Sequence, residues 1–392
     1  MNALTTTETA LNGKVQALLL DQIARGTQLG TQVSVYRNGE QIVDTSAGEM
    51  GPEDPRPVQG DSLFSSFSTT KGVAATALHI LADRGIIDYQ APVAKYWPAF
   101  GKNGKDKITV AQAMSHQSGL HAMPSDPAEC RELLDWEAGL RYIEDGTPAW
   151  EPGTATGYHA VTYGWIAGGI IQYASGRHIQ EVVENEIAAP LGISGQMYIG
   201  IPDGIEDRLA SLQTAPPPTA EQAAASPMAQ IPKDHDFFKA MPPTMGWNFN
   251  DMEVRKACVP SANGHFTGRA LAKMYGALAN GGAIDGARLV SPERISLMSA
   301  IQVTSPDRVI MMPMRKSIGY FNGGKTMGVQ GATGPRETAF GHPGAGGSIA
   351  FADPEVGLGI AVTINKMQTT LQAEGPTFEI CELVRTELGV ND

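Results

Sequence analysis

The two ends of this 392-residue chain carry complementary halves of one α/β unit. Apolar residues in 11–25 recur with the spacing of one helix face, and residues 31–48 predict two strands around Asn38-Gly39, a strong hairpin signal. The order is reversed at the carboxyl end, where residues 348–365 predict two apolar strands and residues 368–388 predict a helix. This order predicts an α+β fold: an antiparallel sheet flanked by N- and C-terminal helices, with a mostly helical domain inserted.

The middle of the chain has mainly helical periodicity. The three clearest helices are predicted in residues 69–84, 161–175 and 267–280. Gly85 stands where the C-cap of the first of them is expected. We therefore place an α/β domain in residues 1–75 and 290–392, a mostly helical domain in residues 76–289, and the active site between the two.

Residues 213–232 differ from the rest of the middle region. They are rich in proline and alanine and have no usable hydrophobic period. We interpret this segment as a linker or a flexible surface loop. A lid over a pocket is the alternative, because loops of this length are often functional.

The charge of the chain limits its partners. It has 29 basic and 41 acidic side chains, with histidine counted as neutral, and a formal net charge of −12. Such an acidic balance argues against nucleic acid and anionic membranes as partners. The amino terminus has no basic region followed by an apolar core, and no apolar run approaches the roughly 20 residues that span a bilayer. We expect a cytoplasmic protein.

The cysteines and histidines do not suggest a metal site. Cys130, Cys258 and Cys381 lie far apart, without a Cys-x-x-Cys spacing, so we predict buried free thiols and neither a disulfide framework nor a zinc site. His116 and His121 are five residues apart and no acidic pattern follows them, which makes a poor metal site. We predict that the protein uses no metal and no cofactor.

A polar stretch at residues 65–72 contains a candidate nucleophile. Ser68 and Lys71 lie three residues apart and so on one face of a helix start, where free backbone N–H groups favour negative charge. A serine hydroxyl becomes a good nucleophile when a base takes its proton, and a lysine whose pKa is depressed by burial can be that base. A serine N-cap would explain the same residues without chemistry. The strongly apolar helix that follows places Lys71 against a core and favours the chemical interpretation.

Two later segments could complete such a site. A Pro-Gly turn at residues 152–153 leads to Tyr158 just before a helix, where the phenol could relay protons or simply pack. His159 beside it is more readily explained as a hydrogen-bonded structural histidine. The glycine-rich segment 341–348 enters a strand, where it could hold a substrate carbonyl against a backbone N–H or form only a turn.

In this order, the segments resemble motifs of the serine β-lactamase and penicillin-binding-protein-like superfamily, in particular of the family VIII carboxylesterases, which share the class C β-lactamase fold. The resemblance runs from about residue 15 to about residue 388. The matching segments are a Ser-x-x-Lys motif at 68–71, a loop at 114–120 similar to LLSHTSGL, the segment 152–158 that ends in the catalytic tyrosine, and a His-x-Gly form of the Lys-Thr-Gly motif at 342–344.

The resemblance implies a set of catalytic roles. Ser68 would attack an ester carbonyl and become acylated, and Lys71 and Tyr158 would share the general base and general acid work. The backbone N–H groups of Ser68 and Ala345 would form the oxyanion hole. Water would then release the acid from the acyl-enzyme.

The substrate-binding residues expected from the resemblance are His342, Gly344 and His159. Two positions depart from the β-lactamase pattern. Ala160 stands two residues after the tyrosine, where those enzymes have an asparagine that holds the antibiotic amide. His342 replaces a lysine that helps to bind the substrate carboxylate, and histidine is mostly neutral at pH 7. Residues 325–328, Lys-Thr-Met-Gly, nearly match Lys-Thr-Gly, but we interpret them as a loop.

The expected function is hydrolysis of small, short-acyl esters. Acyl transfer, weak β-lactamase activity and D-amino-acid peptidase activity are alternatives on the same fold. A non-catalytic ligand-binding or scaffold role is a further alternative, and the presence of Ser68, Lys71 and Tyr158 together disfavours it. The chain has no Gly-x-Ser-x-Gly pentapeptide, which a different class of serine hydrolase would require. The sequence predicts no oligomeric state.

Overall fold

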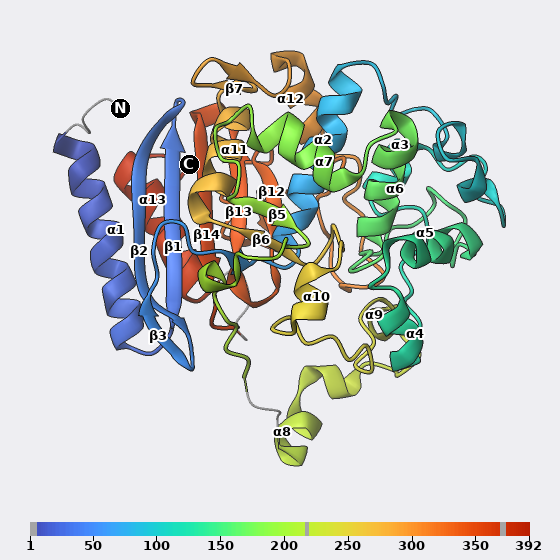
Figure 1. Cartoon of the computed structure of the whole chain (residues 1–392), viewed down its shortest axis with the longest axis horizontal. Helices are drawn as coiled ribbons and strands as arrows, with labels where there is room; N and C mark the ends of the chain where they lie inside the picture. Colours follow the sequence, from blue (N-terminus) through green and yellow to red (C-terminus); the bar gives the residue numbers. More distant parts are fainter. Residues whose placement is uncertain (1–5, 216–218, 369–373) are drawn as a thin grey trace.

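A seven-stranded antiparallel sheet joins the two ends of the chain (Figure 1). The computed structural model describes residues 6–215, 219–368 and 374–392. The strands lie in the order β3 (Asp54–Pro57), β2 (Glu40–Gly51), β1 (Gly30–Arg37), β14 (Leu358–Ile364), β13 (Ile349–Asp353), β12 (Phe340–Pro343) and β9 (Phe321–Asn322). The N-terminal hairpin therefore pairs with the C-terminal one along β1 and β14, with Val33 opposite Val362. The predicted α+β fold with an antiparallel sheet from both termini is confirmed.

Both predicted hairpins form where the turn residues indicated. Asn38 and Gly39 have φ angles of 51° and 82°, and a two-residue turn between twisted strands needs positive φ at both positions. In the other hairpin, Gly357 adopts a φ of 60° just before β14. The backbone N–H of Asn38 donates to the carbonyl of Gly357 at 2.7 Å, so the two turns also support each other.

Two helices cover one face of the sheet, α1 (Thr6–Ala24) and α13 (Pro376–Leu388), as Figure 1 shows. Both turn an apolar side inward: Val15 and Leu19 of α1 are fully buried, as are Ile380 and Val384 of α13. Burying a side chain of this size stabilises the fold by about 1.5–3 kcal/mol. The terminal helices therefore close one layer of the core over the sheet formed by their own neighbours in sequence.

The other face is covered by α2 (Thr69–Asp83) and α11 (Gly268–Ala279). Helix α11 lies so close to β14 that a Cβ on Gly359 would be 2.5 Å from the backbone nitrogen of Gly276. Helix α11 therefore packs on the sheet, and the domain boundary at residue 290 stays a prediction. The apolar period of a helix does not reveal which layer the helix will cover.

The remaining helices are α3 (Val110–Met114), α4 (Pro127–Glu132), α5 (Trp136–Asp145), α6 (Tyr163–Ser175), α7 (Ile179–Val183), α8 (Ala220–Ala225), α9 (Asp236–Ala240), α10 (Met252–Lys256) and α12 (Pro292–Ser299). Close packing here depends on glycines. In α6, a Cβ on Gly168 would be 2.4 Å from the Trp136 ring, and one on Gly169 would be 2.3 Å from the Trp97 ring. The small side of α6 therefore admits two indole rings.

Short strands complete the structure: β4 (Phe64–Ser65), β5 (Met197–Ile199) and β6 (Gly264–Phe266) form one small sheet, and β7 (Ala283–Ile284) pairs with β8 (Ala287–Arg288), as β10 (Lys325–Thr326) does with β11 (Val329–Gln330). The last pair corrects our interpretation of residues 325–328 as a loop. They begin a hairpin whose turn residue Met327 has a φ of 51° and is 79% exposed. An exposed hairpin of two-residue strands carries too few residues to show a strand period.

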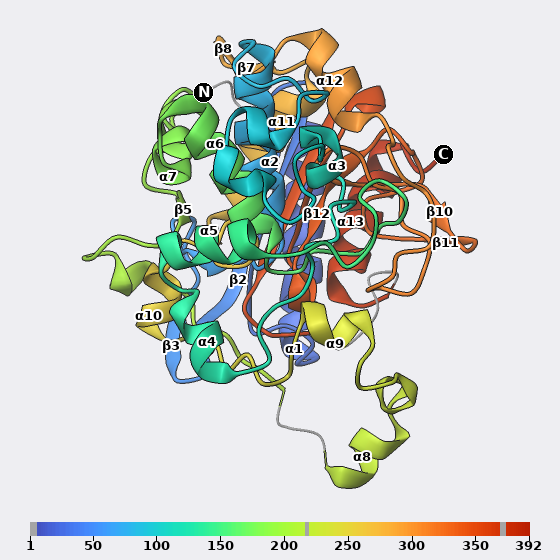
Figure 2. The ribbon, with the colours of Figure 1, turned by 90° about the vertical axis from the view of Figure 1, so that its right-hand side faces the viewer.

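The 213–232 segment contains more structure than we expected. Thr219 and Gln222 form a capping box at the start of α8, and Figure 2 shows α8 projecting from the rest of the molecule. Residues 216–218 lie outside the described residues, as do 369–373 within the C-terminal helix predicted at 368–388. That helix is observed from Pro376.

In the described ranges, no helix combines the length and the apolarity needed to cross a membrane. The three cysteines are buried free thiols, as predicted. Burial raises the pKa of Cys381 to about 11, so its thiol stays protonated at neutral pH.

Candidate active site

Ser68 lies in the turn that connects β4 to α2. It is half-buried, and α2 begins at the next residue. The preceding residue, Phe67, has a φ of 46°, which is unusual for a residue with a side chain and costs backbone strain. The Phe67 ring packs against Phe249, with 4.7 Å between the ring centroids. The strained turn and its aromatic contact place the Ser68 hydroxyl at the start of the helix.

Lys71 lies one turn further along α2 and is completely buried. Its Nζ donates to the carbonyl of Ala160 at 2.6 Å and to that of Ser261 at 2.9 Å, and it lies 3.1 Å from Ser68 Oγ. Burial lowers the pKa of Lys71 well below its ordinary value. A neutral amine has two N–H groups and one lone pair. With both N–H groups held by carbonyls, the lone pair is left for the Ser68 hydroxyl.

Tyr158 approaches Ser68 from the helical part of the molecule. Its hydroxyl donates to Ser68 Oγ at 2.8 Å. Burial raises the pKa of Tyr158, so the phenol is neutral and can donate this hydrogen bond. The Lys71 Nζ lies 4.8 Å from the centre of the tyrosine ring. The structure thus brings together Ser68, Lys71 and Tyr158, which are up to 90 positions apart in sequence.

The Gly344–Ala345 turn lies directly against the residues before Ser68. A Cβ on Gly344 would be 2.3 Å from the carbonyl oxygen of Ser66 and 3.0 Å from Thr69 Oγ1. This close approach explains the glycine, since its φ of −100° would suit any residue. Within the described part of the chain, the N–H groups of Ser68 and Ala345 have no backbone acceptor. The two N–H groups proposed for the oxyanion hole are therefore both available.

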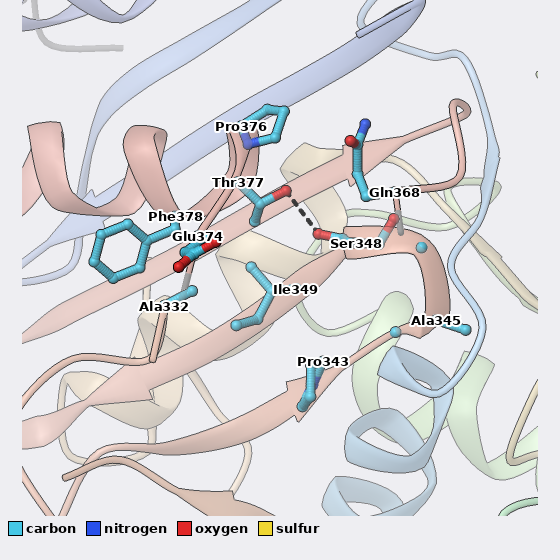
Figure 3. A pocket seen from close by; sticks show the side chains of 13 residues that line it. Ala332, Pro343, Ala345, Ser348, Ile349, Gln368, Glu374, Pro376, Thr377 and Phe378 are labelled. Carbon is cyan, nitrogen blue, oxygen red and sulfur yellow. Dashed lines mark hydrogen bonds between the residues drawn. The ribbon is translucent and has the colours of Figure 1, made fainter. Parts of the chain in front are cut away.

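Behind this turn lies a cavity of about 160 Å³, shown in Figure 3. It is lined by the turn residues 344–347 and by the first turn of α13, but not by Ser68, Lys71 or Tyr158. Thr377 Oγ1 of α13 donates to the carbonyl of Gly347 at 2.8 Å, the bond drawn in the figure. The cavity is separate from the catalytic groups, and α13 supports the turn from the side away from Ser68.

His342 lies beside the catalytic tyrosine. Its ring is buried, 4.5 Å from the Phe321 ring and 5.9 Å from the Tyr158 ring between centroids. Burial and the nearby Lys71 lower the pKa of His342 to about 3. Nδ1 lies 2.7 Å from the carbonyl of Pro343 and must carry the proton, which leaves Nε2 as a bare acceptor. His342 therefore carries no positive charge beside Tyr158, and its Nε2 is a buried acceptor without a hydrogen-bond partner among the described residues.

His159 does not fit the substrate-binding role that we expected for it. The ring is fully buried. Its Nε2 lies 2.8 Å from Ser118 Oγ and accepts from the backbone N–H of Leu120 at 3.1 Å, and its Nδ1 lies 2.6 Å from the carbonyl of Gly157. All of its hydrogen-bonding capacity is used to join two loops. His159 is therefore a hydrogen-bonded structural histidine, which is the simpler explanation from the sequence as well.

The site contains partners that the sequence motifs did not indicate. The carbonyl oxygen of Ser261 is one, and no side-chain pattern could reveal it because the interacting atom belongs to the backbone. The buried ion pair between Asp307 and Lys316, which contacts the tyrosine loop, is another. Among the described residues, no group of three or more histidine, cysteine, aspartate or glutamate side chains could hold a metal ion.

Comparisons with known proteins relate the whole chain to one family. The family model described as Beta-lactamase matches residues 15–380. Esterase/beta-lactamase LipL of Mycobacterium tuberculosis is 36% identical over 352 residues, covering 87% of this chain and 78% of LipL. A crystal structure of a family VIII carboxylesterase superposes with a TM-score of 0.87 at 33% identity. A penicillin-binding protein homologue from Caulobacter crescentus superposes with a TM-score of 0.86 at 33% identity. Each alignment with these two structures covers 99% of both chains.

Proposed function

The chain belongs to the beta-lactamase family and is a serine hydrolase, and we propose that it is a carboxylesterase whose nucleophile is Ser68. One observation carries the proposal: Ser68 Oγ lies within hydrogen-bond distance of both Lys71 Nζ and Tyr158 OH. The buried amine can take the proton of the serine hydroxyl, and the neutral phenol can donate a proton to the leaving group of the substrate.

In the acylation step, Ser68 Oγ attacks the ester carbonyl carbon while its proton moves to the lone pair of Lys71 Nζ. The carbonyl oxygen becomes an oxyanion and accepts hydrogen bonds from the N–H groups of Ser68 and Ala345. Such donors are typically worth about 2.7–4 kcal/mol each in the transition state. Because burial lowers the pKa of Lys71, less free energy is needed to have its amine neutral before the attack.

The tetrahedral intermediate collapses when the C–O bond to the alcohol breaks. We assign the proton for the leaving alkoxide to the Tyr158 hydroxyl, which lies beside Ser68 Oγ, and the proton held by Lys71 restores the phenol. Water then attacks the acyl-enzyme, and its proton reaches the neutral Lys71 amine through the Tyr158 hydroxyl, which accepts the water proton as it gives its own to Lys71. Ser68 Oγ leaves the acyl carbon and regains its hydrogen, and the carboxylic acid departs.

We propose small, neutral, short-acyl esters as the substrates. The similarity to a family VIII carboxylesterase and to LipL supports ester hydrolysis. The neutral His342 and the aromatic rings of Phe67, Phe249 and Phe321 around the site offer no fixed positive charge for an anionic substrate. Rates on p-nitrophenyl esters from acetate to decanoate would define the acyl length.

The nucleophile can be tested with a fluorophosphonate probe and with p-nitrophenyl acetate. Ser68→Ala should abolish labelling and lower ester hydrolysis at least a hundredfold, while the protein folds normally. Ser65→Ala is the matched control in the same polar stretch, and it should label like the wild type because no lysine follows three residues later. Retention of a tenth of the activity by Ser68→Ala would contradict the assignment.

A further inference from the structure

We propose that the buried ion pair of Asp307 and Lys316 is a positioning device for Tyr158. The inference rests on the role of Tyr158 in the proposed function. Both side chains are completely inaccessible to solvent, and they form a salt bridge with each other. The pair comes from the loop region between α12 and β9, far from Tyr158 in sequence.

Asp307 holds the backbone of the catalytic tyrosine. Its Oδ1 accepts a hydrogen bond from the N–H of Tyr158 at 3.1 Å. The same oxygen accepts from the N–H groups of Val309 and Ile310, both at 2.8 Å. The two local bonds fix the carboxylate in its own turn. The third bond fixes the backbone of Tyr158 relative to this carboxylate, and the hydroxyl of Tyr158 must reach Ser68.

Lys316 fastens the same two loops from the other side. Its Nζ donates to Asp307 Oδ2 and, at 2.6 Å, to Thr156 Oγ1. The backbone N–H of Arg308 donates to the carbonyl of Thr156 at 2.9 Å, so main chain and side chains both connect the loops. Thr156 Oγ1 in turn donates to the carbonyl of His116 at 3.2 Å. A buried network of hydrogen bonds therefore connects Lys316, Asp307 and Thr156 to the loop that carries Tyr158.

The placement of this network argues against a role in stability alone. Replacing a buried ion pair by apolar residues is often neutral or even stabilising, because two charges must be removed from water. Burial by itself would raise the pKa of Asp307, but the contact with Lys316 keeps it below its ordinary value, so the carboxylate stays charged. A displacement of about 1 Å can cost a hundredfold in rate. The network holds Tyr158, whose hydroxyl must be positioned this precisely relative to Ser68.

The test is a double-mutant cycle on the rate of Ser68 labelling by a fluorophosphonate. Asp307→Ala with Lys316→Met removes the bond to Tyr158 without leaving an unpaired buried charge. We expect this pair of substitutions to slow labelling about 30-fold or more in the wild-type background. In the Tyr158→Phe background the same pair should slow labelling less than threefold, because the hydroxyl that it positions is already absent.

Two further variants separate positioning from folding. Asp307→Asn with Lys316→Gln keeps neutral hydrogen-bond partners at every contact, and it should restore the labelling rate to within about fivefold of the wild type. Asp353→Ala with Arg336→Met removes a partly buried ion pair that contacts none of Ser68, Lys71 and Tyr158, and it should leave the labelling rate unchanged whatever it does to the melting temperature. If Asp307→Ala with Lys316→Met (the Ala/Met variant) does not fold, Asp307→Asn with Lys316→Gln decides between the outcomes. If that second variant folds but is labelled 30-fold more slowly than the wild type, the proposal is overturned.

Equal losses in the two Tyr158 backgrounds, or an unchanged rate in the folded Ala/Met variant, would also overturn the positioning role. Failure of the proposed function has a different signature. In that case Tyr158→Phe alone labels at the wild-type rate, whatever the substitutions at Asp307 and Lys316 do.

Discussion

Lys71 is buried at a place where the free energy of a charged ammonium group would be unfavourable. The side chain has no contact with solvent, and two of its three polar neighbours are carbonyl oxygens, which fix the N–H groups but do not remove the cost of burying a charge. The result is a lysine that is neutral and still points its lone pair at a hydroxyl. The lowered pKa of Lys71 therefore follows from burial, and its orientation toward Ser68 follows from its hydrogen-bond partners.

The state of Lys71 leads to a prediction about pH. Since burial lowers the pKa of Lys71, the rate of Ser68 acylation should rise with pH through that lowered value and reach its plateau well below pH 10.5, the ordinary pKa of a lysine. Lys71→Arg should lose at least a hundredfold at every pH up to 10, because a guanidinium does not deprotonate in proteins. Fluorophosphonate labelling rates between pH 5 and 10 measure both. A wild-type rate still rising tenfold per pH unit at pH 9 would contradict the neutral lysine.

At the scale of elements, the site depends on how closely the end of β12 approaches the start of α2. Gly344→Ala should push the two apart, because the new Cβ would meet the carbonyl of Ser66. We expect labelling of Ser68 to slow about a hundredfold, as when one oxyanion-hole donor is lost. Gly331→Ala is the matched control, since a Cβ there meets nothing within 4 Å. Labelling of Gly344→Ala within threefold of this control would refute the importance of the contact.

The sequence predicts these elements best where local chemistry determines them. The turn at Asn38-Gly39 and the helix that starts after Ser68 depend on neighbouring residues, and both form as expected. Helix α8 was not predicted, because the segment around its capping residues Thr219 and Gln222 has no hydrophobic period.

Contacts made over long sequence distances could not be predicted in the same way. The placement of α11 on the sheet, the carbonyl of Ser261 at Lys71 and the bond from Tyr158 to Asp307 all require the folded chain. Motif order predicted Ser68, Lys71 and Tyr158, which the structure brings together, because the chemistry proposed for them restricts the residue types. The residues that hold them can be of many types, so their sequence carries no comparable signal.

For the molecule as a whole, buried histidines should make stability sensitive to acid. Burial lowers the pKa of four of them to about 3: His79, His159, His265 and His342. In the unfolded chain their pKa returns to 6.5, so the unfolded state binds more protons between pH 6.5 and 3, and the free energy of unfolding falls as the pH is lowered through this range. Each histidine contributes at most about 1.4 kcal/mol per pH unit.

Urea unfolding between pH 6.5 and 5 measures this effect above the range in which most carboxyl groups titrate. We expect the free energy of unfolding to fall steadily as the pH is lowered. His265→Gln should reduce the slope of this free energy against pH by up to the equivalent of one bound proton. A flat profile over this range in the wild-type protein would mean that the histidines are not buried in the neutral form.

The net charge of −12 and the neutral site together predict which substrates the enzyme rejects. Benzylpenicillin carries a carboxylate and an amide, and the positions that bind these groups in related β-lactamases are His342, which has no charge, and Ala160, which has no polar side chain. Unpaired polar groups cost about 1–3 kcal/mol each on burial, and more when charged. We therefore expect kcat/KM for p-nitrophenyl acetate to exceed that for benzylpenicillin at least about a hundredfold, or roughly 2.7 kcal/mol.

Ionic strength separates the two causes of this preference. An acidic protein repels an anionic substrate at long range, and this repulsion is screened beyond about 10 Å at 0.1 M salt. Raising the salt concentration should therefore increase kcat/KM for penicillin relative to that for the neutral ester. The larger part of the preference should remain, because it arises from unpaired groups inside the site that salt does not reach. Penicillin turnover equal to that of the short esters at any salt concentration would overturn the esterase proposal in favour of β-lactam hydrolysis.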